Sequence, residues 1–172
     1  MKHFVFTAAT VALLLAGCTS FKSFSAFEPA TPADYTGPTA NVADQVVAVS
    51  PQRLHVFEIT QVDGRRLASS SMASTRAGQG SGMTLTPVAL TNELPLRPAQ
   101  VKLQATTQYA SPMLALANAS CRTVGEVRFT PAEGKRYLVN GQIAAKVCEV
   151  WIQDAVTGQP VTEKISGPGT ER

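Results

Sequence analysis

The chain has 172 residues, with 15 lysines and arginines against 12 aspartates and glutamates, and its formal net charge is +3. A charge this small argues against nucleic acid or a strongly acidic surface as a partner. Charged residues make up 16% of the chain, below the roughly 25% usual in soluble domains. The length suits one domain with a single hydrophobic core.

Residues 1–17 are expected to be a lipoprotein signal peptide rather than part of the fold. They contain one lysine, an apolar run from Phe4 to Ala16, and small residues at the end, which is the pattern of an export signal. The run is too short to cross a bilayer, which takes about 20 apolar residues.

The quartet Leu15, Ala16, Gly17 and Cys18 resembles the lipobox of bacterial lipoproteins. The resemblance implies that the signal is cut before Cys18, that the cysteine sulfur is diacylated, and that the new amino terminus is usually acylated as well. Two or three acyl chains hold a protein durably on a membrane. The alternative is an ordinary signal peptide beside which Cys18 is incidental.

The membrane destination follows from the residue after the cysteine. Thr19 stands there and not an aspartate, which in enteric-type lipoproteins resembles the default outer-membrane destination. We expect a lipid-anchored protein that faces the periplasm from the outer membrane, with the inner membrane or the cell surface as alternatives.

Residues 18–44 are expected to be a lipidated amino terminus followed by a flexible tether. Serine, threonine, alanine and proline predominate from Thr19 onward, and the prolines oppose regular helix. Phe21, Phe24 and Phe27 could line a short interfacial helix. We favour the alternative, in which they tuck against the domain or lie in a mobile segment.

The folded domain is expected to span residues 45–172. Val46, Val47 and Val49 predict a first strand, and residues 54–62 and 65–70 predict a hairpin joined by Asp63-Gly64, a favoured pair for a tight turn. His55 is the only histidine after the signal. A metal site that needs several histidines or thiols is therefore not expected.

The middle of the chain gives weaker signals. Residues 69–82 are rich in glycine, serine and threonine and predict a flexible loop, without the lysine and helix of a phosphate loop. Residues 83–90 predict a strand, and residues 92–98 a corner punctuated by proline. Residues 100–109 alternate cleanly and predict a strand, whereas residues 112–119 predict a strand or a short helical connection.

The stretch from Cys121 to Ile152 predicts three strands, because apolar residues recur at every second position in three runs. Residues 131–134 predict one turn, and Asn140-Gly141 a second turn or a bulge. Residues 161–165 predict a last strand.

Cys121 and Cys148 form an even pair once Cys18 carries lipid. In an exported protein they are expected to form a disulfide bond, which would stabilise the fold by about 3.5 kcal/mol. Two independent buried thiols are the alternative.

These eight or nine strands, with no long helix, predict an all-β protein with a single antiparallel β-sandwich. The order of four motifs resembles a group of uncharacterised proteobacterial envelope lipoproteins: YTGPTANVAD, VDGRR, EVRFTPAEGKRYLVNG and VWIQDAVTGQPV. This resemblance implies an immunoglobulin-like or transthyretin-like domain on a lipid anchor, and it implies no known activity.

The inventory of reactive side chains argues against an enzyme. His55 lies on an alternating strand with no evident orienting partner, and Glu58, Glu126 and Glu149 occupy outward strand positions. We expect no catalytic residue, no cofactor and no metal.

The expected role is therefore non-catalytic binding or scaffolding. The expected partners are the membrane, through the lipid anchor, and other envelope proteins, and the oligomeric state is left open. The alternatives are an accessory subunit of a secretion or surface assembly and an unrecognised envelope hydrolase. Trp151, Tyr109 and Arg97 would mark a binding surface if they gathered into one patch.

Overall fold

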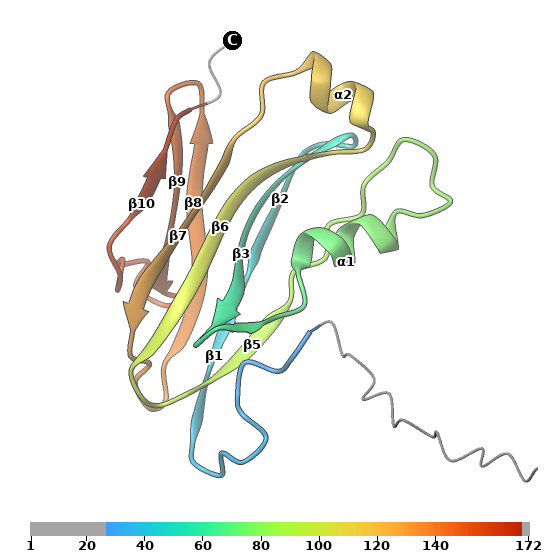
Figure 1. Cartoon of the computed structure of the whole chain (residues 1–172). Helices are drawn as coiled ribbons and strands as arrows, with labels where there is room; N and C mark the ends of the chain where they lie inside the picture. The colour runs from blue at the N-terminus through green and yellow to red at the C-terminus, as the bar shows by residue number, and fades with distance from the viewer. Residues whose placement is uncertain (1–26, 170–172) are drawn as a thin grey trace, which may run out of the picture.

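Two β-sheets face each other in the part of the chain that the computed structural model describes, residues 27–169 (Figure 1). The strands are β1 (Thr39–Ala43), β2 (Gln45–Ser50), β3 (Arg53–Val62), β4 (Arg65–Arg66), β5 (Thr91–Pro95), β6 (Ala99–Tyr109), β7 (Arg122–Phe129), β8 (Arg136–Ala144), β9 (Val147–Asp154) and β10 (Ile165–Gly167). The helices are α1 (Ser70–Ala77) and α2 (Pro112–Ala117).

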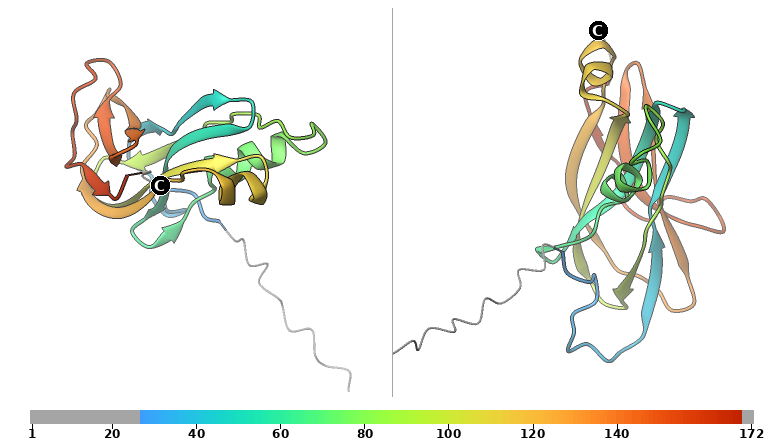
Figure 2. Two further views of the ribbon diagram at one scale, coloured as in Figure 1. Left: turned by 90° about the horizontal axis from the view of Figure 1, so that it is seen from above. Right: turned by 90° about the vertical axis from the view of Figure 1, so that its right-hand side faces the viewer.

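The first sheet has the strand order β10-β9-β8-β1-β5, and the second has the order β2-β3-β6-β7, with β4 paired to β3. The named strands pair antiparallel except for β1 and β8, which run parallel over three residue pairs. The β-sandwich predicted from the sequence is confirmed, with this one parallel pair added. α2 lies at one end of the sandwich, and the segment before β1 lies at the other (Figures 1 and 2).

Apolar side chains from both sheets meet in one core. The alternation predicted for β6 is confirmed, because Val101, Leu103 and Ala105 are fully buried. A valine or leucine side chain contributes about 1.5–3 kcal/mol when it leaves water. Other members of the core with no exposed surface are Val42, Ile59, Val62, Leu94, Val139, Cys148, Val150 and Ile152.

The fold begins before Gln45, so the predicted tether is wrong for residues 27–44. β1 lies between β8 and β5 in the first sheet, and Ala40 and Val42 belong to the core. Phe27 also lies against the domain, with the Arg66 guanidinium carbon 5.9 Å from its ring centre. Two small apolar residues on the inner face were too weak a pattern to predict a strand.

α1 replaces part of the flexible loop predicted for residues 69–82. Ser69 caps it by accepting a hydrogen bond from the Met72 backbone N–H at 3.3 Å. Ser70 and Ser74 face inward and are fully buried. The helix is thus held by buried hydroxyl groups, and apolar periodicity could not have revealed it.

Residues 83–90 form no strand, contrary to prediction. They run beside β2, where the Leu85 N–H donates to the Pro51 carbonyl and the Leu90 carbonyl accepts from the Asp44 N–H, both at 2.8 Å. β5 follows at Thr91–Pro95 on the edge of the first sheet, the position where a strand tolerates proline.

The Asp63-Gly64 turn is confirmed, with φ angles of 47° and 80°. The turn or bulge predicted at Asn140-Gly141 is wrong, because both residues lie inside β8. A Cβ atom at Gly141 would collide with the Phe57 ring and with the Glu149 carbonyl oxygen. Glycine is there because two other elements approach the strand closely.

Candidate functional site

Cys18, the predicted site of lipid attachment, lies outside residues 27–169, and its lipidation stays a prediction. Neither helix of the described chain is long and apolar enough to cross a membrane.

Cys121 and Cys148 form a disulfide bond, with their Cα atoms 5.9 Å apart. The predicted pairing is confirmed. Cys121 directly precedes β7 of the second sheet, and Cys148 lies in β9 of the first. The bond therefore joins the two sheets.

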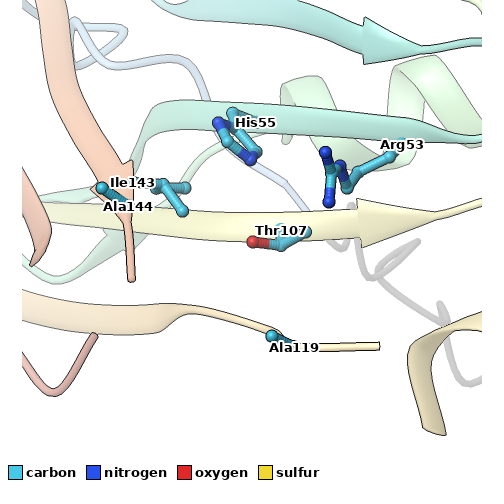
Figure 3. Close-up of a pocket in the computed structure, with 6 residues that line it drawn as sticks. All are labelled: Arg53, His55, Thr107, Ala119, Ile143 and Ala144. Atoms are coloured by element: carbon cyan, nitrogen blue, oxygen red, sulfur yellow. The ribbon is translucent and has the colours of Figure 1, made fainter. Parts of the chain in front are cut away.

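A cavity of about 200 Å³ lies near this disulfide. Figure 3 shows the six residues that line the cavity. The cavity is close to the bond because the Thr107 hydroxyl accepts a 3.2 Å hydrogen bond from the Cys121 N–H, and Ile143 pairs with Cys148 across β8 and β9. β3, β6, β8 and the segment before β7 supply the lining: Arg53, His55, Thr107, Ala119, Ile143 and Ala144.

The cavity carries positive charge without a compensating carboxylate, because Arg53 and His55 are its only titratable lining residues. The Nε atom of Arg53 is buried and has no hydrogen-bond partner within the described chain. Burial, reinforced by the charge of Arg53, lowers the pKa of His55. At neutral pH the cavity therefore holds one fixed charge, on Arg53, beside an uncharged imidazole.

A second polar cluster lies where α1 begins, around the side chain of Glu58. The sequence placed Glu58 on an outward strand position, which is wrong, because α1 covers it and leaves it 0% exposed. Its two oxygens accept hydrogen bonds from the hydroxyls of Ser69 and Ser71, both at 2.9 Å, and from the Gln104 amide at 3.2 Å. The Ser71 backbone N–H also donates to Glu58 at 3.1 Å, so the carboxylate satisfies a group at the helix start.

Asp44 lies beside this cluster, at the point where the chain passes from β1 to β2 and so from one sheet to the other. Its oxygens accept hydrogen bonds from the Ile59 N–H at 3.0 Å and from the Ser70 hydroxyl at 2.6 Å. Burial nevertheless raises the pKa of Asp44 to about 7, and the charge of Glu58 acts in the same direction.

The Asp44 and Glu58 cluster has a structural role, which is to hold α1 in place. Ser70, the hydroxyl that contacts Asp44, is fully buried and already accepts a hydrogen bond from the Leu90 N–H. A substrate could not reach it without displacing α1. The cluster ties α1 to the sheet crossing and to the segment that follows the helix.

Trp151, Tyr109 and Arg97 do not form one patch. Trp151 is 9% exposed, and the Lys164 ammonium lies 4.3 Å from its ring centre. The Tyr109 hydroxyl donates a 2.6 Å hydrogen bond to the Ala119 carbonyl. Tyr109 ends β6, whereas Arg97 precedes the start of that strand, so the two lie at opposite ends of it.

The described residues contain no group of three or more histidine, cysteine, aspartate or glutamate side chains able to hold a metal ion.

No protein-family model, curated protein or solved structure matches this chain.

Sequence reasoning missed Arg53 as a site residue, although a signal was present. Arg53 and His55 share the strand face of Phe57 and Ile59, so two polar residues stand at the end of a face that is otherwise apolar and inward. Charged residues on an inward face are uncommon and point to a partner or a cavity.

Proposed function

We propose that this chain is an exported lipoprotein, anchored to the outer membrane through Cys18, whose β-sandwich binds or scaffolds other envelope proteins without catalysing a reaction. The observation that carries the proposal is the quartet Leu15 to Cys18 at the end of the apolar run. Acyl chains on this cysteine would provide a durable anchor.

The disulfide supports the proposal from the other end of the chain. The sequence contains three cysteines, and Cys121 and Cys148 are bonded to each other. Disulfides persist in oxidising compartments outside the cytoplasm. Cys18 is then the one cysteine left over, as a lipid-bearing residue requires.

Within the sandwich class, we favour the immunoglobulin-like over the transthyretin-like variant. A disulfide that joins the two sheets supports this choice, because antibody domains carry such a bond between strands of opposite sheets. The similarity is one of architecture only, since the order β2-β3-β6-β7 differs from the immunoglobulin order in its last strand.

A role as accessory subunit of a secretion or surface assembly is the second candidate. Its support is α2, which lies at one end of the sandwich (Figure 1) and leaves the Met113 side chain 73% exposed. Exposed methionine suits adaptable contacts with a partner. The hydrolase alternative has less support, because the Ser70 hydroxyl that contacts Asp44 is fully buried.

The anchor is tested by metabolic labelling with a palmitate analogue. Cys18→Ser should lose both the label and membrane association, whereas the double variant Cys121→Ser/Cys148→Ser should keep the label. Labelling that persists in Cys18→Ser would refute the anchor.

Crosslinking in intact cells, followed by mass spectrometry, separates the two candidate roles. A single abundant partner favours the assembly subunit, and the absence of a dominant partner favours the general scaffolding role.

A further inference from the structure

We propose that the cavity lined by Arg53 and His55 is a binding site for a small carboxylate that carries a short apolar group. The proposal goes beyond the binding role suggested above, whose partners are other envelope proteins, and it does not depend on the lipid anchor.

Within the described chain, Arg53 has one buried N–H group without a hydrogen-bond partner and no carboxylate beside it in the cavity lining. A buried N–H group without a partner costs free energy, and more so when it belongs to a charged group. The Nε atom of Arg53 is such a group within residues 27–169. A guanidinium has a planar fork of donors that matches the two oxygens of a carboxylate. A ligand carboxylate would therefore balance the charge of Arg53, which no described residue of the cavity lining does.

Further hydrogen-bond donors lie around the same cavity. In Figure 3 the side chains of Arg53 and His55 extend from β3 into the space that Thr107 borders from β6. The neutral His55 imidazole keeps one N–H to donate. The hydroxyl of Thr107 also has a proton to donate, because it acts as acceptor toward Cys121.

The charge and the lining of the cavity determine which ligand fits it. With one fixed positive charge and a neutral imidazole, the cavity balances a monoanion better than a dianion such as hydrogen phosphate. Ala119, Ile143 and Ala144 form an apolar wall, which suits a methyl or methylene group. A cavity of about 200 Å³ is several times the roughly 30 Å³ of liquid volume that one water molecule takes, which leaves room for one small organic acid.

His55 provides a local readout for the test. The full sequence contains two histidines, His3 and His55, so histidine labelled with ¹³C at Cε1 alone gives at most two ring signals, and His55→Gln assigns them. Arg53 and His55 are the titratable groups that β3, β6, β8 and the segment before β7 present to the cavity. A bound carboxylate would add a negative charge next to the imidazole and raise the pKa of His55.

The experiment uses the full chain purified in detergent, with butyrate, its neutral isostere butyramide, and inorganic phosphate as probes. Butyrate should shift the His55 signal along a saturable curve, with a dissociation constant on the order of millimolar for a ligand this small. Butyramide and phosphate should bind at least roughly tenfold more weakly, because each loses the match of charge or shape.

Two arginine variants distinguish a specific site from general charge. Arg53→Gln should weaken butyrate binding roughly tenfold or more. Arg128→Gln removes an exposed arginine on β7 and should leave the affinity unchanged. Melting temperatures of both variants verify that they fold.

The proposal would be overturned by the absence of a saturable shift with butyrate, by equal binding of butyramide, or by equal weakening from the two arginine substitutions. If phosphate binds tighter than butyrate, the cavity is an anion site of another class, and the carboxylate assignment is wrong. None of these outcomes bears on Cys18, and loss of the anchor would leave the cavity intact, so the two proposals fail separately.

Discussion

The hydroxyl of Ser70 donates a 2.6 Å hydrogen bond to the carboxyl group of Asp44. This contact joins the first turn of α1 to the point where the chain crosses from one sheet to the other. Asp44 is 2% exposed and Ser70 is fully buried. The contact therefore couples the packing of the helix to the charge state of a buried acid.

The stability of the protein should fall as the pH rises through the range that separates the folded and unfolded pKa of Asp44. Burial raises that pKa from the ordinary 3.8 to about 7, so the folded state binds the proton more tightly. The stabilisation from this protonated carboxyl group is fully present below the ordinary pKa and is lost by about pH 7. Urea unfolding should show a loss of about 2–3 kcal/mol between about pH 5 and about pH 8.

Asp44→Asn should remove most of this pH dependence. An asparagine oxygen can still accept from the Ile59 N–H, and its amide can donate to the Ser70 hydroxyl. A variant that keeps the full slope between those two pH values would show that Asp44 is not responsible.

The disulfide should stabilise the fold by restricting the unfolded chain. Cys121 and Cys148 are separated by 27 positions, and closing a loop of this length is worth about 3.5 kcal/mol in the chain-entropy model. The double variant Cys121→Ser/Cys148→Ser should unfold at a correspondingly lower urea concentration. Thiol counting on the unsubstituted protein, unfolded in denaturant without reductant, should find neither Cys121 nor Cys148 reactive. If both thiols react, the bond does not exist.

Gly141→Ala should destabilise the protein by about 2–3 kcal/mol, because the new methyl group collides with the Phe57 ring and the backbone of Glu149. Gly125→Ala on β7 is the matched control. Its Cβ atom would meet the Ile165 side chain, which is only partly buried and can move. Thermal unfolding of both should show the larger loss for position 141, and equal losses would refute the assigned packing.

Asp154→Asn should lower the melting temperature at neutral pH but not near pH 2. Hydrogen bonds from the backbone N–H groups of Thr157 and Val156, with further help from Lys135, lower the pKa of Asp154 to about 2. Its contribution to stability is present above the ordinary pKa and disappears as the pH falls through the folded value. The exposed Asp34 offers a control, since Asp34→Asn should leave the melting temperature unchanged at both pH values.

The sequence predicts the strands best where alternation is long. β6 keeps Val101, Leu103 and Ala105 on its inner face. β3 keeps Phe57 and Ile59 inward up to the register shift that follows Ile59, and Ile59 pairs with Leu103 of β6. β1 escaped prediction, because only Ala40 and Val42 mark its inner face. α1 escaped because its inward groups are the hydroxyls of serine residues, which no hydrophobic period detects.

Some features of the candidate sites could be predicted from the sequence, and others could not. The pairing of Cys121 with Cys148 followed from parity and from the expected compartment, without any knowledge of distance. The buried position of Glu58 could not be inferred, because α1 folds over an otherwise outward face of β3. The cavity at Arg53 depends on residues from four segments far apart in the sequence, which only the folded chain brings together.

Intact-mass spectrometry of the protein from the membrane fraction tests the proposed lipoprotein most directly. We predict a chain that begins at Cys18, carries two or three acyl groups, and lacks two hydrogens because of the Cys121–Cys148 bond. A chain without acyl groups, or one that retains residues 1–17, would contradict the proposal.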